Sequence, residues 1–331
     1  MKKEKPSVIK RITSSREVSL LIILVAISIL VTLQSPSFMT YSSIMDMLRN
    51  NAVLMIMTVG MLCVLLIGGI DISITSTLAM TGMTIGMLVR HNVVTNTLLL
   101  FLLSLVIGTV CGLIVGLVIS KGRVLPIIAT MGFMYIYRGL AFLIANNQWA
   151  SAADLSEFRV FALGEVLGIN NVVLIMLIIF IIFFFVMKWT KIGRKIYAVG
   201  SNIEAAAISG INTDNVQLLV YTIMGTLSGF SGALAVSVYA SAQPNMLFGR
   251  EMDVIAGCVI GGVSMQGGRG TVVGAFLGSL ILAVIAKALP LVGIESIAQN
   301  TVKGVLILVV VILNVITQRG MEKKNLKERE I

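Results

Sequence analysis

Long apolar stretches separated by short polar segments dominate the pattern of hydrophobic and polar positions along the chain. Several stretches approach the roughly 20 residues that a helix needs to cross a hydrocarbon core about 30 Å thick. We therefore predict an all-α, polytopic membrane protein with about ten transmembrane helices, some of them broken or re-entrant. The predicted crossings are residues 18–33, 52–67, 72–89, 97–119, 124–144, 172–187, 216–239, 254–265, 271–289 and 302–316.

Two of the predicted crossings are irregular. The stretch 254–265 is short, and two glycines and an aspartate interrupt the chain between 67 and 72, so either region can be a re-entrant half-helix shielded by protein. The same two regions carry an internal repeat, LIGGI at 66–70 and VIGGV at 259–263. Broken segments in corresponding halves of a transporter often mark its central pathway. We therefore predict a solute pathway at Gly68, Gly69, Asp71, Ser73, Gly261, Gly262 and Ser264.

The composition agrees with a lipid environment. Of the 331 residues, 57% are hydrophobic and 12% are charged, against about 25% charged in a typical soluble domain. We expect a single transmembrane domain over 18–316, which includes a cytoplasmic loop at 188–215. Cytoplasmic tails at 1–17 and 317–331 flank this domain.

The formal net charge is +10, and the positions of the basic residues predict the orientation. Cytoplasmic loops of membrane proteins collect Lys and Arg. With both termini cytoplasmic, 18 of the 25 basic residues fall on the inner side, and 7 acidic residues balance the 7 basic residues outside. The basic residues stand at the ends of apolar stretches and not on a polar face with interleaved aromatics, so we expect no nucleic-acid partner.

Asp71 is the acidic residue most closely flanked by hydrophobic sequence on both sides. A carboxylate in the middle of a bilayer costs about 2.5–3.5 kcal/mol on insertion scales, so it should face protein, water or free backbone amides. One interpretation is that Asp71 lines or gates the solute pathway. The other is that it caps the helix that starts near Ile72, where it meets orphan amides and the positive helix dipole. The two interpretations are compatible.

The polar segment after residue 187 predicts a short helix in the cytoplasm. Asn202 can cap this helix, Glu204 falls in its first turn, Ala205 and Ala206 favour the helical state, and Gly210 can close it. A stiff helix with few bulky side chains can press into a groove on a partner. The alternative is a solvated connector on the membrane surface.

The sequence does not support an enzymatic role. The segment GGRG at 267–270 resembles a phosphate loop, but the chain has no GK[ST] triplet and therefore lacks a Walker A motif. It has no Ser/His/Asp set, and we expect no catalytic residue and no metal site. Cys63, Cys111 and Cys258 lie within apolar stretches and are predicted to be buried thiols.

The motifs together resemble the ribose, rhamnose and autoinducer-2 branch of bacterial ABC sugar-importer permeases, from about residue 52 to 316. The resemblance is carried by GGIDIS at 68–73, ATMG at 129–132, YRG at 137–139, GR at 193–194, YAVGSN at 197–202, EAA at 204–206, SGI at 209–211, IGGVS at 260–264 and GGRG at 267–270. It implies a permease subunit of the bacterial cytoplasmic (inner) membrane that translocates a small sugar or sugar-like solute inward and has no ATPase site of its own.

The same resemblance implies several partners. These are a cytoplasmic ABC ATPase that binds ATP and Mg²⁺, a periplasmic or lipid-anchored solute-binding protein, and a second permease copy or a paralogue, all working within membrane lipid. In such a permease the predicted cytoplasmic helix is the coupling helix that docks on the ATPase. The residues implied in coupling are Asn202, Glu204, Ala205, Ala206 and Gly210.

The chain departs from the family pattern near the expected pathway. Ile74 and Thr75 stand where Val-Gly is usual, and Phe133 stands where a small polar residue is common, so the solute is not identified. The alternative function is an ion-coupled secondary transporter, which would need coupling-ion ligands or a chain of protonatable groups in its spans. Asp71 is the one good candidate. A third possibility is an intramembrane enzyme or an assembly scaffold. It has no support, because the sequence shows no reactive cluster and this role would not explain the stiff cytoplasmic helix.

Overall fold

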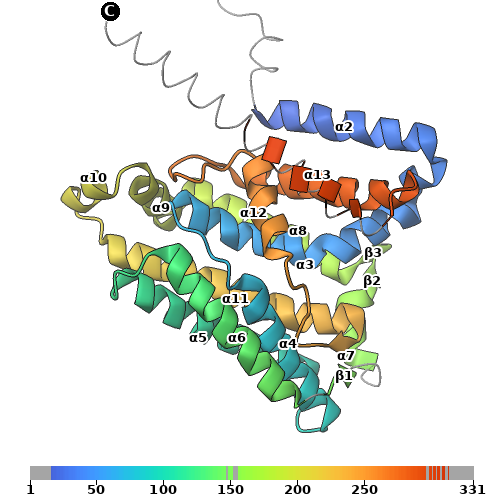
Figure 1. Cartoon of the computed structure of the whole chain (residues 1–331), viewed down its shortest axis with the longest axis horizontal. Helices are drawn as coiled ribbons and strands as arrows, with labels where there is room; N and C mark the ends of the chain where they lie inside the picture. Colours follow the sequence, from blue (N-terminus) through green and yellow to red (C-terminus); the bar gives the residue numbers. More distant parts are fainter. Residues whose placement is uncertain are drawn as a thin grey trace, which may run out of the picture.

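The computed structural model describes residues 16–146, 148–151, 156–295, 298–299, 301–302, 304–305, 308–309 and 312. Helices dominate these residues, which confirms the all-α prediction (Figure 1). Residues 1–15 of the predicted N-terminal tail, most of the predicted crossing 302–316, and the predicted tail 317–331 lie outside the described residues.

Seven helices in the described part of the chain are long and apolar enough to cross a membrane, and each overlaps a predicted crossing. The predicted count of about ten is therefore not confirmed. The seven helices are α2 (Arg16–Gln34), α3 (Tyr41–Leu66), α5 (Thr97–Ser120), α6 (Pro126–Ala145), α8 (Asn171–Trp189), α11 (Thr213–Tyr239) and α13 (Val272–Leu291).

Two other predicted crossings form helices of fewer than 18 residues, each next to an irregular segment. Helix α4 (Ile74–Arg90) has 17 residues and follows a turn at Gly68, whose φ is +75°. Helix α12 (Glu251–Ile260) has ten residues, so it is about 15 Å long and covers about half of a hydrocarbon core. The stretch 254–265 is thus a half-helix followed by a loop, one of the two possibilities that its length left open.

The short elements lie at the two ends of the long helices (Figure 1). Helices α9 (Lys191–Ser201) and α10 (Ile203–Ile208) lie at one end. At the other end lie α7 (Ser156–Leu163) and two antiparallel strand pairs. The pairs are β1 (Ala150–Ser151) with β4 (Ser241–Ala242), and β2 (Glu165–Val166) with β3 (Ile169–Asn170). The helical turn η1 (Pro36–Met39) joins α2 to α3.

Ion pairs and hydrogen bonds connect the loops at the end of the protein that carries α9 and α10. We call this end the basic end. The carboxylate of Asp214 forms ion pairs with Lys121 at 3.3 Å and Arg123 at 3.2 Å, joining the α5–α6 loop to the start of α11. The Thr271 hydroxyl donates to Glu17 Oε1 at 3.1 Å, so α2 and α13 also begin here. Residues predicted to share the cytoplasmic side therefore do share one end of the protein.

The centre of the protein is formed by α3 and α11, whose membrane windows are 78% and 72% buried, whereas α2 lies at the rim. Helices α5 and α11 approach so closely that glycines replace side chains at their contact. A Cβ on Gly108 or Gly112 would overlap the α11 backbone, and one on Gly225 or Gly229 would overlap the α5 backbone. Small residues commonly allow such close helix packing in membranes.

The three cysteines are free and buried, as predicted. The Cys258 thiol donates to the carbonyl oxygen of Thr58 at 3.3 Å, which joins α12 to α3.

Candidate functional site

Helix α10 forms where the sequence predicts the cytoplasmic helix. Asn202 Oδ1 accepts a 2.8 Å hydrogen bond from the amide of Ala205, which satisfies one of the orphan donors of the first turn. At the other end Gly210 has a φ of +81°, and its amide and that of Ile211 donate back into the last turn, each at 3.0 Å. This is the Schellman arrangement, which favours glycine because the left-handed conformation strains other residues.

The faces of α10 differ in exposure. Glu204 and Ala205 are exposed, and Ile208 is 89% exposed at the far end of the helix. Ala206, predicted as a coupling residue, is buried against the protein, so it packs α10 onto its own chain. The sequence analysis did not single out Ile208, although an isoleucine in a polar segment is a signal for a contact surface.

Helix α9 connects α10 to the membrane helices. It was predicted only as part of a polar loop, but Thr190 caps it through a 3.3 Å hydrogen bond from the amide of Gly193. Ile196 and Val199 are buried. The Tyr197 hydroxyl donates to the carbonyl oxygen of Gly270 at 2.7 Å, and burial raises the pKa of Tyr197, which keeps the hydroxyl protonated as a donor.

The end of α9 meets the end of α3 and the GGRG segment at 267–270 in one junction. The amide of Gly268 donates to the carbonyl oxygen of Leu66 at 2.8 Å. Gly200 fills the remaining space, because a Cβ there would overlap that same carbonyl oxygen and lie 2.7 Å from the amide nitrogen of Gly268. We call these three residues the Gly200 junction. A cavity of about 270 Å³ lies beside it, between the end of α9 and the loop 264–269.

The first group of predicted pathway residues surrounds the start of α4. Asp71 is 3% exposed, and its Oδ1 accepts hydrogen bonds from the amide of Ser73 at 2.9 Å and from the Ser73 hydroxyl at 2.6 Å. Ser73 immediately precedes α4, so the carboxylate fixes the turn that leads into this helix, but its hydrogen bonds go to Ser73 and not to the amides of α4. Gly69 packs under the Tyr221 hydroxyl, where a Cβ would overlap the oxygen. The pathway role of these residues stays a prediction.

The second group does not gather around Asp71 as one site. Gly261 packs against Gly274 at the start of α13 with no room for a Cβ, and Gly262 lies under the guanidinium of Arg16. Ser264 closes the loop before α13, where its amide donates to the carbonyl oxygen of Arg269 at 2.8 Å. The two groups approach each other at Gly68, where a Cβ would lie 3.5 Å from the carbonyl oxygen of Gln266.

A buried polar network joins both broken segments, and the sequence analysis missed it. Arg138 donates to the carbonyl oxygens of Pro244 at 2.7 Å and Met246 at 3.2 Å, and to the Thr75 hydroxyl at 3.2 Å. Thr75 in turn donates to Glu251 Oε2 at 2.7 Å. The charge count placed Arg138 and Glu251 among the outer polar residues, but both are buried. The sequence did contain a signal for this network, because Arg138 lies within an apolar stretch, and a charged residue inside a membrane span is by default a candidate functional residue.

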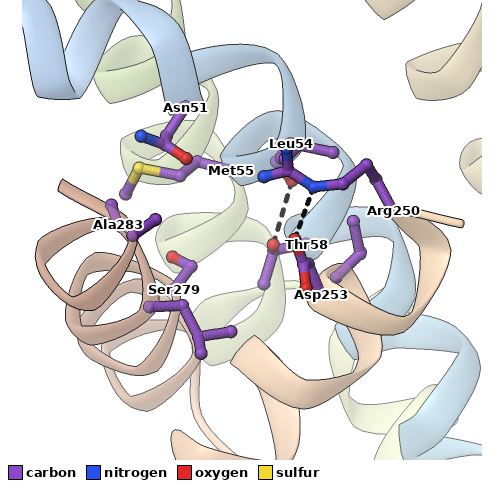
Figure 2. Close-up of a pocket in the computed structure, with 11 residues that line it drawn as sticks. Asn51, Leu54, Met55, Thr58, Arg250, Asp253, Ser279 and Ala283 are labelled. Carbon is purple, nitrogen blue, oxygen red and sulfur yellow. Dashed lines mark hydrogen bonds and ion pairs between the residues drawn. The ribbon is translucent and has the colours of Figure 1, made fainter. Parts of the chain in front are cut away.

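Further polar groups adjoin this network where α3, α12 and α13 meet (Figure 2). Arg250, which precedes α12, forms an ion pair with Asp253 at 2.5 Å between Nε and Oδ2. Asn51 and Thr58 of α3 and Ser279 of α13 line the same cavity of about 20 Å³, which is close to the volume of one water molecule on this measure. Side chains of three helices thus place polar groups inside an apolar bundle.

Comparison with known proteins gives a consistent result. The family model described as "Branched-chain amino acid transport system / permease component" matches residues 43–313. The chain is 38% identical over 301 residues to the ribose import permease protein RbsC of Escherichia coli (strain K12), covering 89% of this chain and 92% of that protein. It is 37% identical over 287 residues to the ribose import permease protein of Bacillus subtilis (strain 168), covering 86% and 88%.

A more distant relative is the L-arabinose ABC transporter permease protein AraH of Azospirillum brasilense, which is 30% identical over 287 residues, covering 86% of this chain and 83% of that protein. No solved structure matches the chain. The matched region runs from α3 to beyond α13 and includes the Gly200 junction, α10 and the buried polar network. The chain therefore belongs to the family of transport-system permease components and is a multi-pass permease subunit of the membrane.

Proposed function

We propose that this chain is the membrane-spanning subunit of an ABC importer that moves a small sugar or sugar-like solute inward across the bacterial inner membrane. Support comes from relatives named for ribose and arabinose, which match nearly the full length of the chain. The resemblance of the motifs points to the same solute class.

The observation that best supports an ATP-driven mechanism is the connection from α10 to the Gly200 junction. An ATPase that docks on the exposed face of α10 would pull on α9. Because main-chain atoms fill the junction, α9 cannot shift there without moving the end of α3 and the loop before α13. Movement at the surface would therefore reach the broken segments, in which rigid elements joined by irregular backbone can change their relative positions.

We assign ATP and Mg²⁺ to the separate ATPase, since this chain has no Walker A motif. The basic end would then face the cytoplasm, in agreement with the positive-inside rule. Helix α2 starts at this end, so the N-terminus would be cytoplasmic, and the ten crossings predicted from the sequence would bring the C-terminus to the same side. A periplasmic or lipid-anchored solute-binding protein would dock at the opposite end, and a second permease copy or a paralogue would complete the pathway.

The decisive test is uptake into liposomes. The permease is reconstituted with and without its ATPase, and uptake of labelled ribose and arabinose is followed in the presence of the solute-binding protein. We expect uptake only when the ATPase and ATP are present inside. Accumulation by the permease alone, driven by an ion gradient, would favour the ion-coupled secondary transporter instead.

A further inference from the structure

A groove on the outer surface of α8 and α13 combines an apolar part with a basic opening. The apolar part is a cavity of about 340 Å³ lined by apolar side chains, among them Phe180, Phe184 and Phe276. A larger cavity of about 610 Å³ adjoins it and shares Phe184, Val272 and Val273 with it. Lys188 and Arg194 line this second cavity. Because the two cavities share lining residues, we call them together the α8–α13 groove.

Aromatic side chains mark the level of the opening. Trp189 stacks on Phe185 with ring centroids 4.8 Å apart, and Phe184 meets Trp189 edge-on at 5.4 Å. The Lys188 ammonium lies over the Trp189 ring, 4.8 Å from its centroid. Phe185 and Trp189 are both exposed. Exposed aromatic and basic side chains at the end of an apolar helix are typical of the membrane interface.

The charges at the opening favour an anion. Lys188 and Arg194 are exposed and line the cavity with one carboxylate, that of Glu17. Glu17 already accepts a 3.1 Å hydrogen bond from the Thr271 hydroxyl. Lys191 and Lys195 are exposed on the same short helix, α9. A basic amphipathic helix at the end of an apolar groove provides both interactions that a charged lipid needs.

We propose that the α8–α13 groove binds an anionic phospholipid, with its phosphate at Lys188 and Arg194 and an acyl chain against Phe180, Phe184 and Phe276. A free phosphate ion would leave the apolar cavity unfilled, and an apolar protein helix would remove water from Lys188 and Arg194 without offering them a partner. A phospholipid satisfies both parts. It would also join α8, α9 and α13 at the base of the segment that carries α10.

Native mass spectrometry of the full-length permease tests this proposal. The purified protein is titrated with phosphatidylglycerol or with phosphatidylcholine, in the absence of ATPase and solute, so the result does not depend on the proposed transport function. We expect phosphatidylglycerol to bind at least tenfold more tightly. The double variant Lys188→Gln/Arg194→Gln should lose about 30-fold in phosphatidylglycerol affinity.

A matched charge control separates a defined site from diffuse attraction. The double variant Lys191→Gln/Lys195→Gln removes two cations from the same helix but leaves the groove intact, and its affinity should stay within about threefold of the wild type. An equal loss in both double variants would overturn the proposal, as would equal binding of the two lipids by the wild type.

A second variant tests the apolar part. Val273→Trp fills the cavity shared by α8 and α13 and should reduce binding of both lipids at least tenfold, whereas Val106→Trp, on the exposed face of α5, should leave it unchanged. If Val273→Cys instead cross-links two permease copies and the purified protein carries no lipid there, the groove is a subunit interface and the proposal is wrong.

Discussion

The hydroxyl of Thr75 donates a 2.7 Å hydrogen bond to Oε2 of Glu251, and this bond holds the starts of α4 and α12 together. Both helices follow irregular segments, so the bond joins the two broken regions of the bundle. Arg138 also donates to Thr75, which lets one hydroxyl mediate between two buried charged groups.

Removal of this hydroxyl should destabilise the protein. Thr75→Val keeps the side-chain volume but leaves Glu251 and Arg138 each without one partner, at a cost of about 1–3 kcal/mol. Thr75→Ser keeps the hydroxyl and is the matched control. Thermal unfolding in detergent should show a clearly lower midpoint for Thr75→Val than for Thr75→Ser. Equal midpoints for the two variants would mean that the hydrogen bond contributes nothing.

The Gly200 junction should not accept any side chain. In Gly200→Ala the new methyl group overlaps the carbonyl oxygen of Leu66, so α9 must separate from the end of α3. We expect ATP-dependent uptake in liposomes to fall at least tenfold. Overpacking typically costs about 1–3 kcal/mol, so size-exclusion chromatography is needed to show that the variant is still folded.

Gly139→Ala is the control for this substitution. Gly139 is also helical, but a Cβ there has no atom within 4 Å, and the variant should transport normally. A folded Gly200→Ala variant with normal uptake would show that movement does not pass through the junction.

The exposed tip of α10 should determine the affinity for the ATPase. Ile208 is 89% exposed, so Ile208→Asp is expected to leave the unfolding midpoint unchanged. A buried carboxylate in an apolar interface is unfavourable, so ATPase binding should weaken at least tenfold in a pull-down titration. Leu167→Asp, which changes a 97% exposed residue at the opposite end, should bind the ATPase normally. Unchanged binding of Ile208→Asp would place the docking surface elsewhere.

Substitutions of Asp71 can separate its two predicted roles. Asn retains an oxygen that can accept both hydrogen bonds from Ser73, so Asp71→Asn should fold with a midpoint near that of the wild type. Asp71→Ala loses both bonds and should unfold at a lower temperature. If the carboxylate also contributes to the pathway, folded Asp71→Asn will lose solute uptake. Normal uptake by this variant would restrict Asp71 to fixing the turn before α4.

Local features of this protein could be predicted from the sequence. The ends of α10 were predicted because a cap depends only on neighbouring residues, as at Asn202 and Gly210. The seven long helices were predicted because hydropathy is summed over a single window. The break after Leu66 was also visible, since Gly68 and Gly69 interrupt the apolar pattern there.

Non-local contacts could not be predicted in the same way. The hydrogen bond from Gly268 to Leu66 joins the loop before α13 to the end of α3, and neither residue type specifies its partner. The network of Arg138, Thr75 and Glu251 was missed because the positive-inside count assigned Arg138 and Glu251 to the outer polar residues, although Arg138 lies inside an apolar stretch. Whether a charge faces water or a buried partner depends on tertiary packing, which that count does not include.

The Gly200 junction consists of main-chain atoms on all three sides, so its geometry is independent of the side chains on α10. The exposed face of α10 would select the ATPase, and the Gly200 junction would transmit its movement. These two functions therefore depend on different residues. Substitutions within residues 203–208 would then alter ATPase recognition and leave the junction unchanged. A chimaera that receives only residues 203–208 from a relative should bind the ATPase of that relative and still transport the same solute as the parent chain.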